Sequence, residues 1–299
     1  MTEQVIGVRR SRSTTGRLSG WQRYRRDTGG MIGLITLAVI IVIAILTPLI
    51  SPRAGLSVIN TTDNPVLSPP SSQWLLGTDS FGRSIGSQIL WGARTSLLVG
   101  LLATLLTMTV GTLVGVIGGY SGGWIDRSLS RFTEWFLVIP FLPLAIVLAS
   151  LLGRSLRNMI LVIALTSWPA TARVLRAQVL TLKERLYVER SRALGASGTA
   201  IVRRHIMPNL WPLVIANTAL TAPVAILTES TLAFLGLGNP FNASWGKMLN
   251  DAREAGAISS SAWWWYLPSG IAIVVVVLSL TLVGRAIEAV LNPRSQERR

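Results

Sequence analysis

Six runs of apolar residues, each about long enough to cross a bilayer, constrain this chain more than any other feature. They occupy residues 30–50, 95–118, 132–152, 159–175, 209–235 and 267–289. A membrane-spanning helix needs about 20 predominantly apolar residues. Half of the 299 residues are hydrophobic and 14% are charged, a balance that excludes an ordinary soluble domain. The sequence therefore predicts an all-α, polytopic membrane protein with six transmembrane helices.

The distribution of lysine and arginine predicts which ends of these helices face the cytoplasm. Basic residues gather before residue 30, at 127–131, at 173–204 and after residue 285. The alternate connections are poorer in them; their basic residues are Arg53, Arg83, Arg94, Arg154, Arg157, Lys247 and Arg253. Cytoplasmic loops carry the excess of Lys and Arg, so both termini are expected inside. This rule accounts for the net charge of +15 without a nucleic-acid partner.

The same assignment divides the chain into segments. We expect a basic cytoplasmic tail (1–29), a first transmembrane helix (30–50), an extracytoplasmic segment (51–91), a five-helix core (92–292) and a cytoplasmic tail (293–299). No small-residue cleavage site follows the first apolar run, so we interpret that run as an uncleaved span rather than a signal peptide. Pro140 and Pro143 lie inside the third run, where they would break backbone hydrogen bonds.

The basic segment 184–208 lies on the cytoplasmic side between the fourth and fifth runs. Its charges cannot lie in hydrocarbon, yet its pattern is that of ordered structure. Residues 184–194 predict a short helix that Gly195 ends in the left-handed conformation. Ser197 can cap a second short helix over 198–206, and Pro208 would begin the next span. A helix–turn–helix between two spans suits docking onto a soluble partner.

The residues of this segment resemble the EAA loop of ATP-binding-cassette (ABC) importer permeases. The pattern E-A-A, three residues, G, nine residues, I, one residue, L-P is matched by Glu189, Gly195 and Pro208. It is not matched at four positions, where the chain has Arg190, Ser191, His205 and Met207. The resemblance implies a type I importer fold in which this loop docks onto an ATPase subunit. The implied docking residues are Glu189, Arg190, Ser191, Ala193, Leu194, Gly195 and Ala196.

Three more blocks resemble one branch of this family, the C-type subunit of dipeptide, oligopeptide and nickel importers. They are L-G-T-D-S-F-G-R-S at 76–84, E-S-T-L-A-F-L-G-L-G at 229–238 and S-W-G-K-M-L at 244–249. In the first block Ser84 replaces the usual aspartate. Asp79 and Arg83 could pair across one turn if the segment is helical; a local turn, a gate contact or a site for a binding protein all remain open.

Two features inside the spans have both structural and functional interpretations. Gly111, Gly115 and Gly119 recur every four residues, a spacing that predicts close approach of another helix; a gate hinge is the alternative. Glu229 lies in an apolar context near the outer end of the fifth run. We expect it either to line a cavity or to meet a structural partner, such as an outer arginine.

Three functional classes compete for a chain of this kind: an ABC permease, an ion-driven carrier or channel, and an intramembrane enzyme. The chain has no cysteine and a single histidine, and it lacks the arrangements of a nucleophile or a metalloprotease. A carrier needs ionisable groups along its path, and Glu229 is the one candidate. We therefore expect a permease rather than an enzyme, without a bound cofactor or metal.

The resemblance also implies partners and a location. The chain lacks a Walker A sequence, so ATP and Mg²⁺ would be bound by separate ATPase subunits. A B-type permease subunit would complete the pore in the bacterial inner membrane, and an extracytoplasmic binding protein would deliver the substrate. That substrate would be a di- or oligopeptide, or alternatively a nickel chelate or another small solute.

Overall fold

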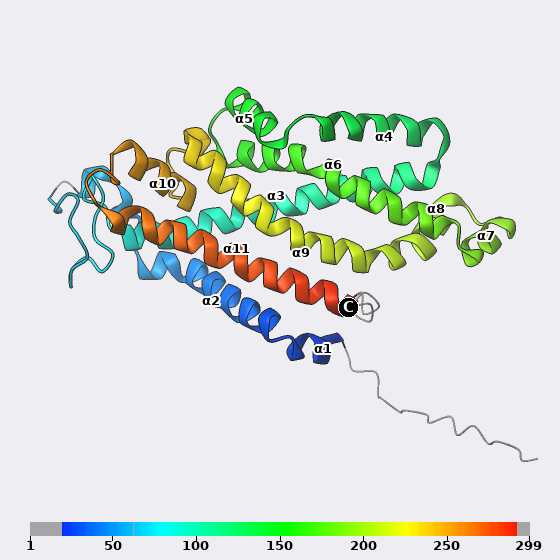
Figure 1. Cartoon of the computed structure of the whole chain (residues 1–299), viewed down its shortest axis with the longest axis horizontal. Coiled ribbons are helices and arrows are strands. Elements are labelled where there is room, and N and C mark those ends of the chain that lie inside the picture. Colours follow the sequence, from blue (N-terminus) through cyan, green and yellow to red (C-terminus); the bar gives the residue numbers. More distant parts are fainter. Residues whose placement is uncertain (1–19, 62, 292–299) are drawn as a thin grey trace, which may run out of the picture.

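The computed structural model describes residues 20–61 and 63–291, and these residues form a bundle of helices (Figure 1). The two tails predicted at 1–29 and 293–299 therefore lie largely or wholly outside the described residues. The helices are α1 (Gly20–Arg26), α2 (Thr28–Ile50), α3 (Ile85–Ser121), α4 (Gly123–Val138), α5 (Phe141–Leu152), α6 (Leu156–Lys183), α7 (Leu186–Ala193), α8 (Gly198–Ile201), α9 (Met207–Leu232), α10 (Trp245–Glu254) and α11 (Trp263–Leu291). Short helical turns occupy Arg53–Leu56 (η1), Val58–Thr61 (η2), Val202–Ile206 (η3) and Ala233–Leu237 (η4).

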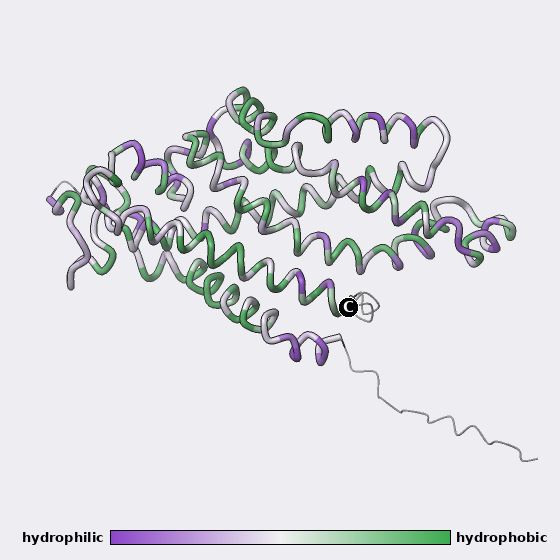
Figure 2. Tube along the Cα trace, in the orientation of Figure 1, coloured by the Kyte–Doolittle hydropathy of each residue, from purple (hydrophilic) through white to green (hydrophobic). Residues whose placement is uncertain are grey.

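Five helical stretches are long and apolar enough to cross a membrane, and a sixth crossing forms if the bent pair α4–α5 is counted as one span. The prediction of an all-α membrane protein is confirmed, and the predicted six spans are reached when the bent pair is taken as one. In Figure 1, α7 and α8 lie at one end of the bundle, and α10 lies at the other with the segment that precedes α3. Figure 2 shows hydrophobic residues along α2 and α11, whereas α1, α7 and the start of α4 are hydrophilic.

The third span differs from its prediction. Residues 120–131 are not a loop, because α3 continues to Ser121 and α4 begins after a turn at Gly122 and Gly123, both with positive φ. The expected span at 132–152 is instead two helices that meet at 92°. The bend follows from Pro140: the residue before a proline is driven out of the helical region, and Ile139 has an extended backbone with ψ 127°.

Other helices extend beyond the apolar runs that predicted them. Helix α3 begins at Ile85, ten residues before the expected start, and the side chain of Ser84 accepts a hydrogen bond from the Ser87 backbone N–H as its cap. Helix α6 runs from Leu156 to Lys183 rather than over 159–175. These extra turns are buried against other parts of the protein, so packing rather than hydropathy sets their length.

The glycine pattern in α3 is a contact surface, as predicted. A β-carbon added at Gly111 would lie 2.6 Å from Thr171, and one at Gly115 would lie 2.8 Å from the Ala172 carbonyl oxygen. One at Gly119 would lie 2.9 Å from Val179. The three glycines thus let the backbone of α3 approach α6 closely.

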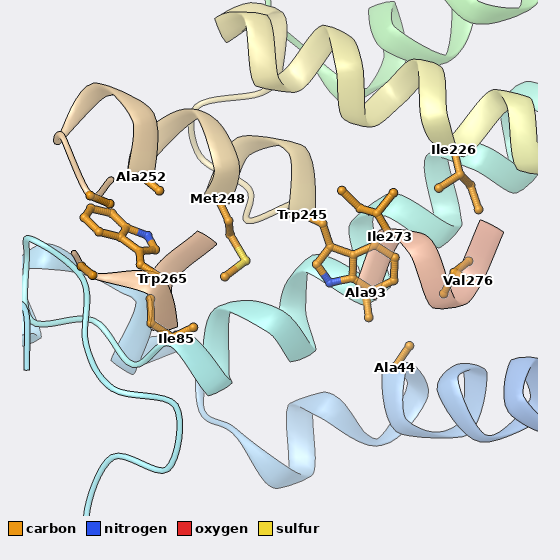
Figure 3. Packing of buried hydrophobic residues seen from close by; sticks show 12 residues of the cluster. Ala44, Ile85, Ala93, Ile226, Trp245, Met248, Ala252, Trp265, Ile273 and Val276 are labelled. Carbon is orange, nitrogen blue, oxygen red and sulfur yellow. The ribbon is translucent and has the colours of Figure 1, made fainter. Parts of the chain in front are cut away.

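The end of the bundle opposite α7 has its own hydrophobic core, which α10 closes (Figure 3). The Trp245 side chain is 2% exposed, and its indole N–H donates to the Ile89 carbonyl of α3 at 3.1 Å. Trp265 of α11 is fully buried in the same cluster. The region that follows α9 therefore turns back into the protein instead of extending outward.

A polar contact near the middle of the bundle joins three helices. The amide nitrogen of Asn217 on α9 lies 3.4 Å from the Thr171 hydroxyl on α6 and 3.8 Å from the Met108 sulfur on α3. Three spans therefore meet at one point, roughly midway along α9.

Candidate functional site

The charged segment 184–208 lies at one tip of the molecule (Figure 1). Its helix α7 follows α6 and precedes α8 along the chain. The helix is somewhat shorter than the expected 184–194 and covers Leu186–Ala193. Val188 anchors it, because this side chain is fully buried against Val179, Leu182, Ile201 and Ile206. One apolar residue therefore holds a short polar helix on the ends of two spans.

Gly195 ends this helix as predicted. Its φ is +82°, the left-handed region that side chains rarely adopt. The N–H of Gly195 donates to the Arg192 carbonyl at 3.0 Å, and the N–H of Ala196 donates to the Ser191 carbonyl at 3.1 Å. These bonds satisfy carbonyls that the helix end would leave unpaired.

The second half of the loop differs from its prediction. Ser197 does cap α8, its hydroxyl accepting from the Ala200 N–H at 3.3 Å. However, α8 is not a separate short helix over 198–206. It passes through the π-helical turn η3 into α9, so that the helical stretch is continuous from residue 198 to residue 235, where the left-handed backbone of Gly236 (φ +81°) introduces a kink. Pro208 lies in the first turn of α9, directly after the π-helical turn, and does not interrupt the stretch.

His205 closes the loop from within, a role that the sequence did not indicate. Its Nε2 lies 3.0 Å from the Ser191 hydroxyl, and its ring stacks obliquely at 5.8 Å from that of Tyr187. Both partners belong to α7, whereas His205 lies in η3. Two of the four residues that depart from the family pattern, Ser191 and His205, thus contact each other.

The expected docking residues lie on the surface of this tip. Ser191 and Ala196 are partly buried, and the exposed ones are Glu189, Arg190, Ala193, Leu194 and Gly195. Leu194 is 87% exposed, and Leu186, at the other end of α7, is 72% exposed. Both large apolar side chains are displayed among charges.

Glu189 also borders a polar cavity of about 460 Å³. The opposite wall is the end of α3, where Lys183 reaches across to donate to the Gly119 carbonyl at 3.0 Å. The remaining lining residues are Tyr120, Ser121, Gly122, Glu184 and Arg192. The loop thus forms one surface with the end of α3, which the sequence pattern alone did not place beside it.

A bidentate ion pair joins α4 to α6 near the same end of the molecule. The Arg176 guanidinium donates to both carboxylate oxygens of Asp126, at 2.6 and 2.8 Å. The two residues are 50 positions apart, so no local spacing could have indicated the pair. Fork-shaped pairs of this kind fix geometry as well as adding energy, and this one fixes the start of the bent span.

Asp79 and Arg83 form their expected pair, although the segment is a turn and not a helix. The Arg83 Nε lies 2.6 Å from an Asp79 oxygen. Asp79 is fully buried and also accepts from the N–H groups of Phe81 and Arg83 and from the Gln88 side chain. Arg83 lies 3.6 Å from Asp251 of α10. The geometry favours a structural turn that ties the segment before α3 to α10.

Glu229 is buried near the outer end of α9, with 3% of the residue exposed. Its carboxylate accepts from Ser96 of α3 at 3.0 Å and from Ser230 at 3.3 Å. The Ser96 hydroxyl accepts in turn from the backbone N–H of Trp245 at 3.4 Å. Among the described residues, Glu229 has a structural partner as one alternative predicted, but the partners are serine hydroxyls rather than an arginine. These contacts connect three helices through Glu229.

Clusters of metal-ligating side chains are absent from residues 20–61 and 63–291.

Two known protein families match parts of this chain. Residues 111–297 match the family described as the inner membrane component of binding-protein-dependent transport systems. Residues 18–70 match the N-terminal transmembrane domain of oligopeptide transport permease C. The chain belongs to the binding-protein-dependent permease family.

Characterised relatives cover nearly the whole permease. The dipeptide transport system permease protein DppC of Bacillus subtilis is 35% identical over 92% of this chain and 84% of its own length. The oligopeptide permease protein OppC of the same organism is 34% identical over 93% and 90%. The glutathione transport system permease protein GsiD of Escherichia coli is 35% identical over 92% and 89%. The recognition of a C-type permease from its sequence blocks is confirmed.

Proposed function

We propose that this permease is one half of the translocation pore of an ATP-driven importer for di- or oligopeptides. The observation that carries the proposal is the loop at the tip of the bundle, where α7, Gly195 and α8 display Leu186 and Leu194 to a partner. The names of the relatives support peptides over the alternative, a nickel chelate or another small solute.

The partners follow from what the chain itself can do. The loop docks onto an ABC ATPase subunit, which binds ATP and Mg²⁺, because this sequence has no Walker A motif. A related B-type permease supplies the other half of the pore, and an extracytoplasmic binding protein supplies the peptide. The permease itself has no catalytic activity in this scheme.

The mechanism is alternating access driven from the loop. Closure of the ATPase pair around ATP brings the docked loops together, and the helices connected to them carry the movement across the membrane. The continuous helical stretch 198–235 supports this scheme, because α8 passes without a loop into the span that follows. An ion-driven carrier is less well supported: Glu229 is sealed among serines rather than lining a water-filled path.

The partners can be tested by purification from native membranes in mild detergent. We expect a second permease chain and an ATPase to copurify with this one, and peptide-dependent ATP hydrolysis after reconstitution with the binding protein. Purification of the chain as a homo-oligomer that transports without ATP would overturn the proposal and support a carrier.

We further propose that the permease lies in the bacterial inner membrane with both termini in the cytoplasm. The chain has no cysteine, so single cysteines can be introduced at Ser11, Asn64, Asn242 and Ser295. An impermeant thiol reagent that reaches only the extracytoplasmic side is expected to label positions 64 and 242. Labelling of position 11 or 295 would show that the orientation is wrong.

A further inference from the structure

An apolar groove of about 540 Å³ runs along the outside of the bundle between α2 and α3. Helix α2 supplies Ile41 and Ile45, and α3 supplies Leu98 and Leu101, all more than 40% exposed. Ile226 of α9 lines the floor and is 2% exposed. The groove is thus a long apolar depression at membrane depth.

The groove ends at an arginine. Arg94 of α3 is the one charged residue in its lining. Because side chains of a helix tilt toward its N-terminus, and α3 begins at the outer end of the bundle, Arg94 points toward the outer surface. Its guanidinium lies 5.8 Å from the centre of the Trp91 ring, one turn further out.

A second arginine converges on the same tryptophan. The Arg53 guanidinium, just beyond the end of α2, lies 4.8 Å from the centre of the Trp91 ring. The Trp91 indole N–H donates to the Ser51 carbonyl at the α2 C-cap, at 3.1 Å. Tryptophans concentrate at the membrane–water interface, so both cations lie where α2 leaves the membrane.

Neither arginine has a carboxylate partner. Among the described residues, the ion pairs join Arg83, Arg176, Lys247 and Arg253 to acids, and none involves Arg53 or Arg94. Cation–π contact with one indole offsets some of the charge but leaves the guanidinium donors free. Two exposed, unpaired cations beside an apolar groove form a site for an anion that carries a hydrocarbon chain.

We propose that this site binds an anionic glycerophospholipid from the outer leaflet. Its phosphate lies between Arg53 and Arg94, and one acyl chain fills the groove between α2 and α3. The lipid source is preferred over free phosphate because the groove is apolar and opens to the membrane. The ligand would stabilise the attachment of α2, whose direct contacts with α3 include the Thr47 hydroxyl 3.3 Å from the Leu90 carbonyl.

The test uses the complex as purified from membranes, depleted of lipid by detergent exchange. Phosphatidylglycerol and phosphatidylcholine of equal chain length are added at equal concentration, and retained lipid is counted by native mass spectrometry. We expect phosphatidylglycerol to be preferred over phosphatidylcholine. Each interfacial cation should raise the ratio of bound phosphatidylglycerol to bound phosphatidylcholine about fivefold. Arg53→Gln with Arg94→Gln should remove the preference. Leu98→Trp, which fills the groove but keeps both arginines, should reduce retention of both lipids.

The matched control is Arg154→Gln with Arg157→Gln. These two arginines are also exposed at the outer end of the bundle, but they flank the turn between α5 and α6, away from α2 (Figure 1). The control should keep the lipid preference. The proposal is overturned if wild-type protein shows no preference, if the Arg53 and Arg94 variant retains it, or if a photocrosslinker at position 98 reacts with a second protein chain instead of lipid. None of these outcomes depends on transport.

Discussion

Gly195→Val is expected to abolish ATP-coupled transport while leaving the permease in the membrane. Gly195 adopts φ +82° between α7 and α8, and a side chain in this region costs about 1–2 kcal/mol. The strain would distort the turn that sets α7 relative to α8, and the new side chain would project into the docking surface, because no atom of the chain lies within 4 Å of it. We expect transport to fall at least about tenfold, equivalent to about 1.4 kcal/mol of coupling.

The chain provides a closely matched control for this substitution. Gly153 has φ +84° and, like Gly195, has no atom within 4 Å of an added β-carbon. It lies in the turn between α5 and α6 at the opposite end of the bundle. Gly153→Val also places a side chain at positive φ, in a region (φ 84°, ψ 165°) essentially restricted to glycine, and should keep ATPase association in a pull-down and transport in vesicles. Equal effects of the two substitutions would mean that strain, not docking, matters at Gly195.

Gly115→Leu should destabilise the permease itself. An added β-carbon would lie 2.8 Å from the Ala172 carbonyl oxygen and 3.1 Å from the Arg176 backbone nitrogen. Both are backbone atoms of α6, so no rotamer change can relieve the contact and the two helices must separate. Overpacking typically costs about 1–3 kcal/mol, and we expect the upper part of this range. The measurement is the melting temperature of the purified protein in detergent.

Gly270→Leu tests whether the loss at Gly115 comes from packing. Gly270 also lies inside a long helix, α11, but an added β-carbon there meets nothing within 4 Å. Since leucine is a better helix former than glycine by up to about 1 kcal/mol, this variant should be as stable as the wild type or more so. A melting temperature that falls equally in both variants would contradict the role of Gly115 in helix contact.

The sequence predicted those features that depend on local composition. Hydropathy located the spans because each must satisfy its backbone within a bilayer. The four-residue spacing of Gly111, Gly115 and Gly119 predicted close approach of another helix, because the contact needs small residues on one helix face. Gly195 and Ser197 were recognised as helix punctuation since their conformations are determined within a few residues.

Features that depend on distant contacts could not be predicted in this way. Helix α10 is stabilised by burying Trp245 against α3, and nothing near Trp245 in the sequence indicates that neighbour. The pair between Asp126 and Arg176 and the serine partners of Glu229 likewise exist only after the helices assemble. Pro140 indicated a weakness in the third span, but the size of the bend, 92°, could not be derived from the local sequence.

The continuity of residues 198–235 has a mechanical consequence. Up to the left-handed backbone of Gly236, at 1.5 Å per residue, this stretch measures about 55 Å, and Asn217, which contacts both α3 and α6, lies close to its midpoint. A lever that turns about its centre moves its two ends in opposite directions. An inward push on α8 would therefore swing Glu229 and the attached α10 outward, so that a single helix converts closure on one side of the membrane into opening on the other.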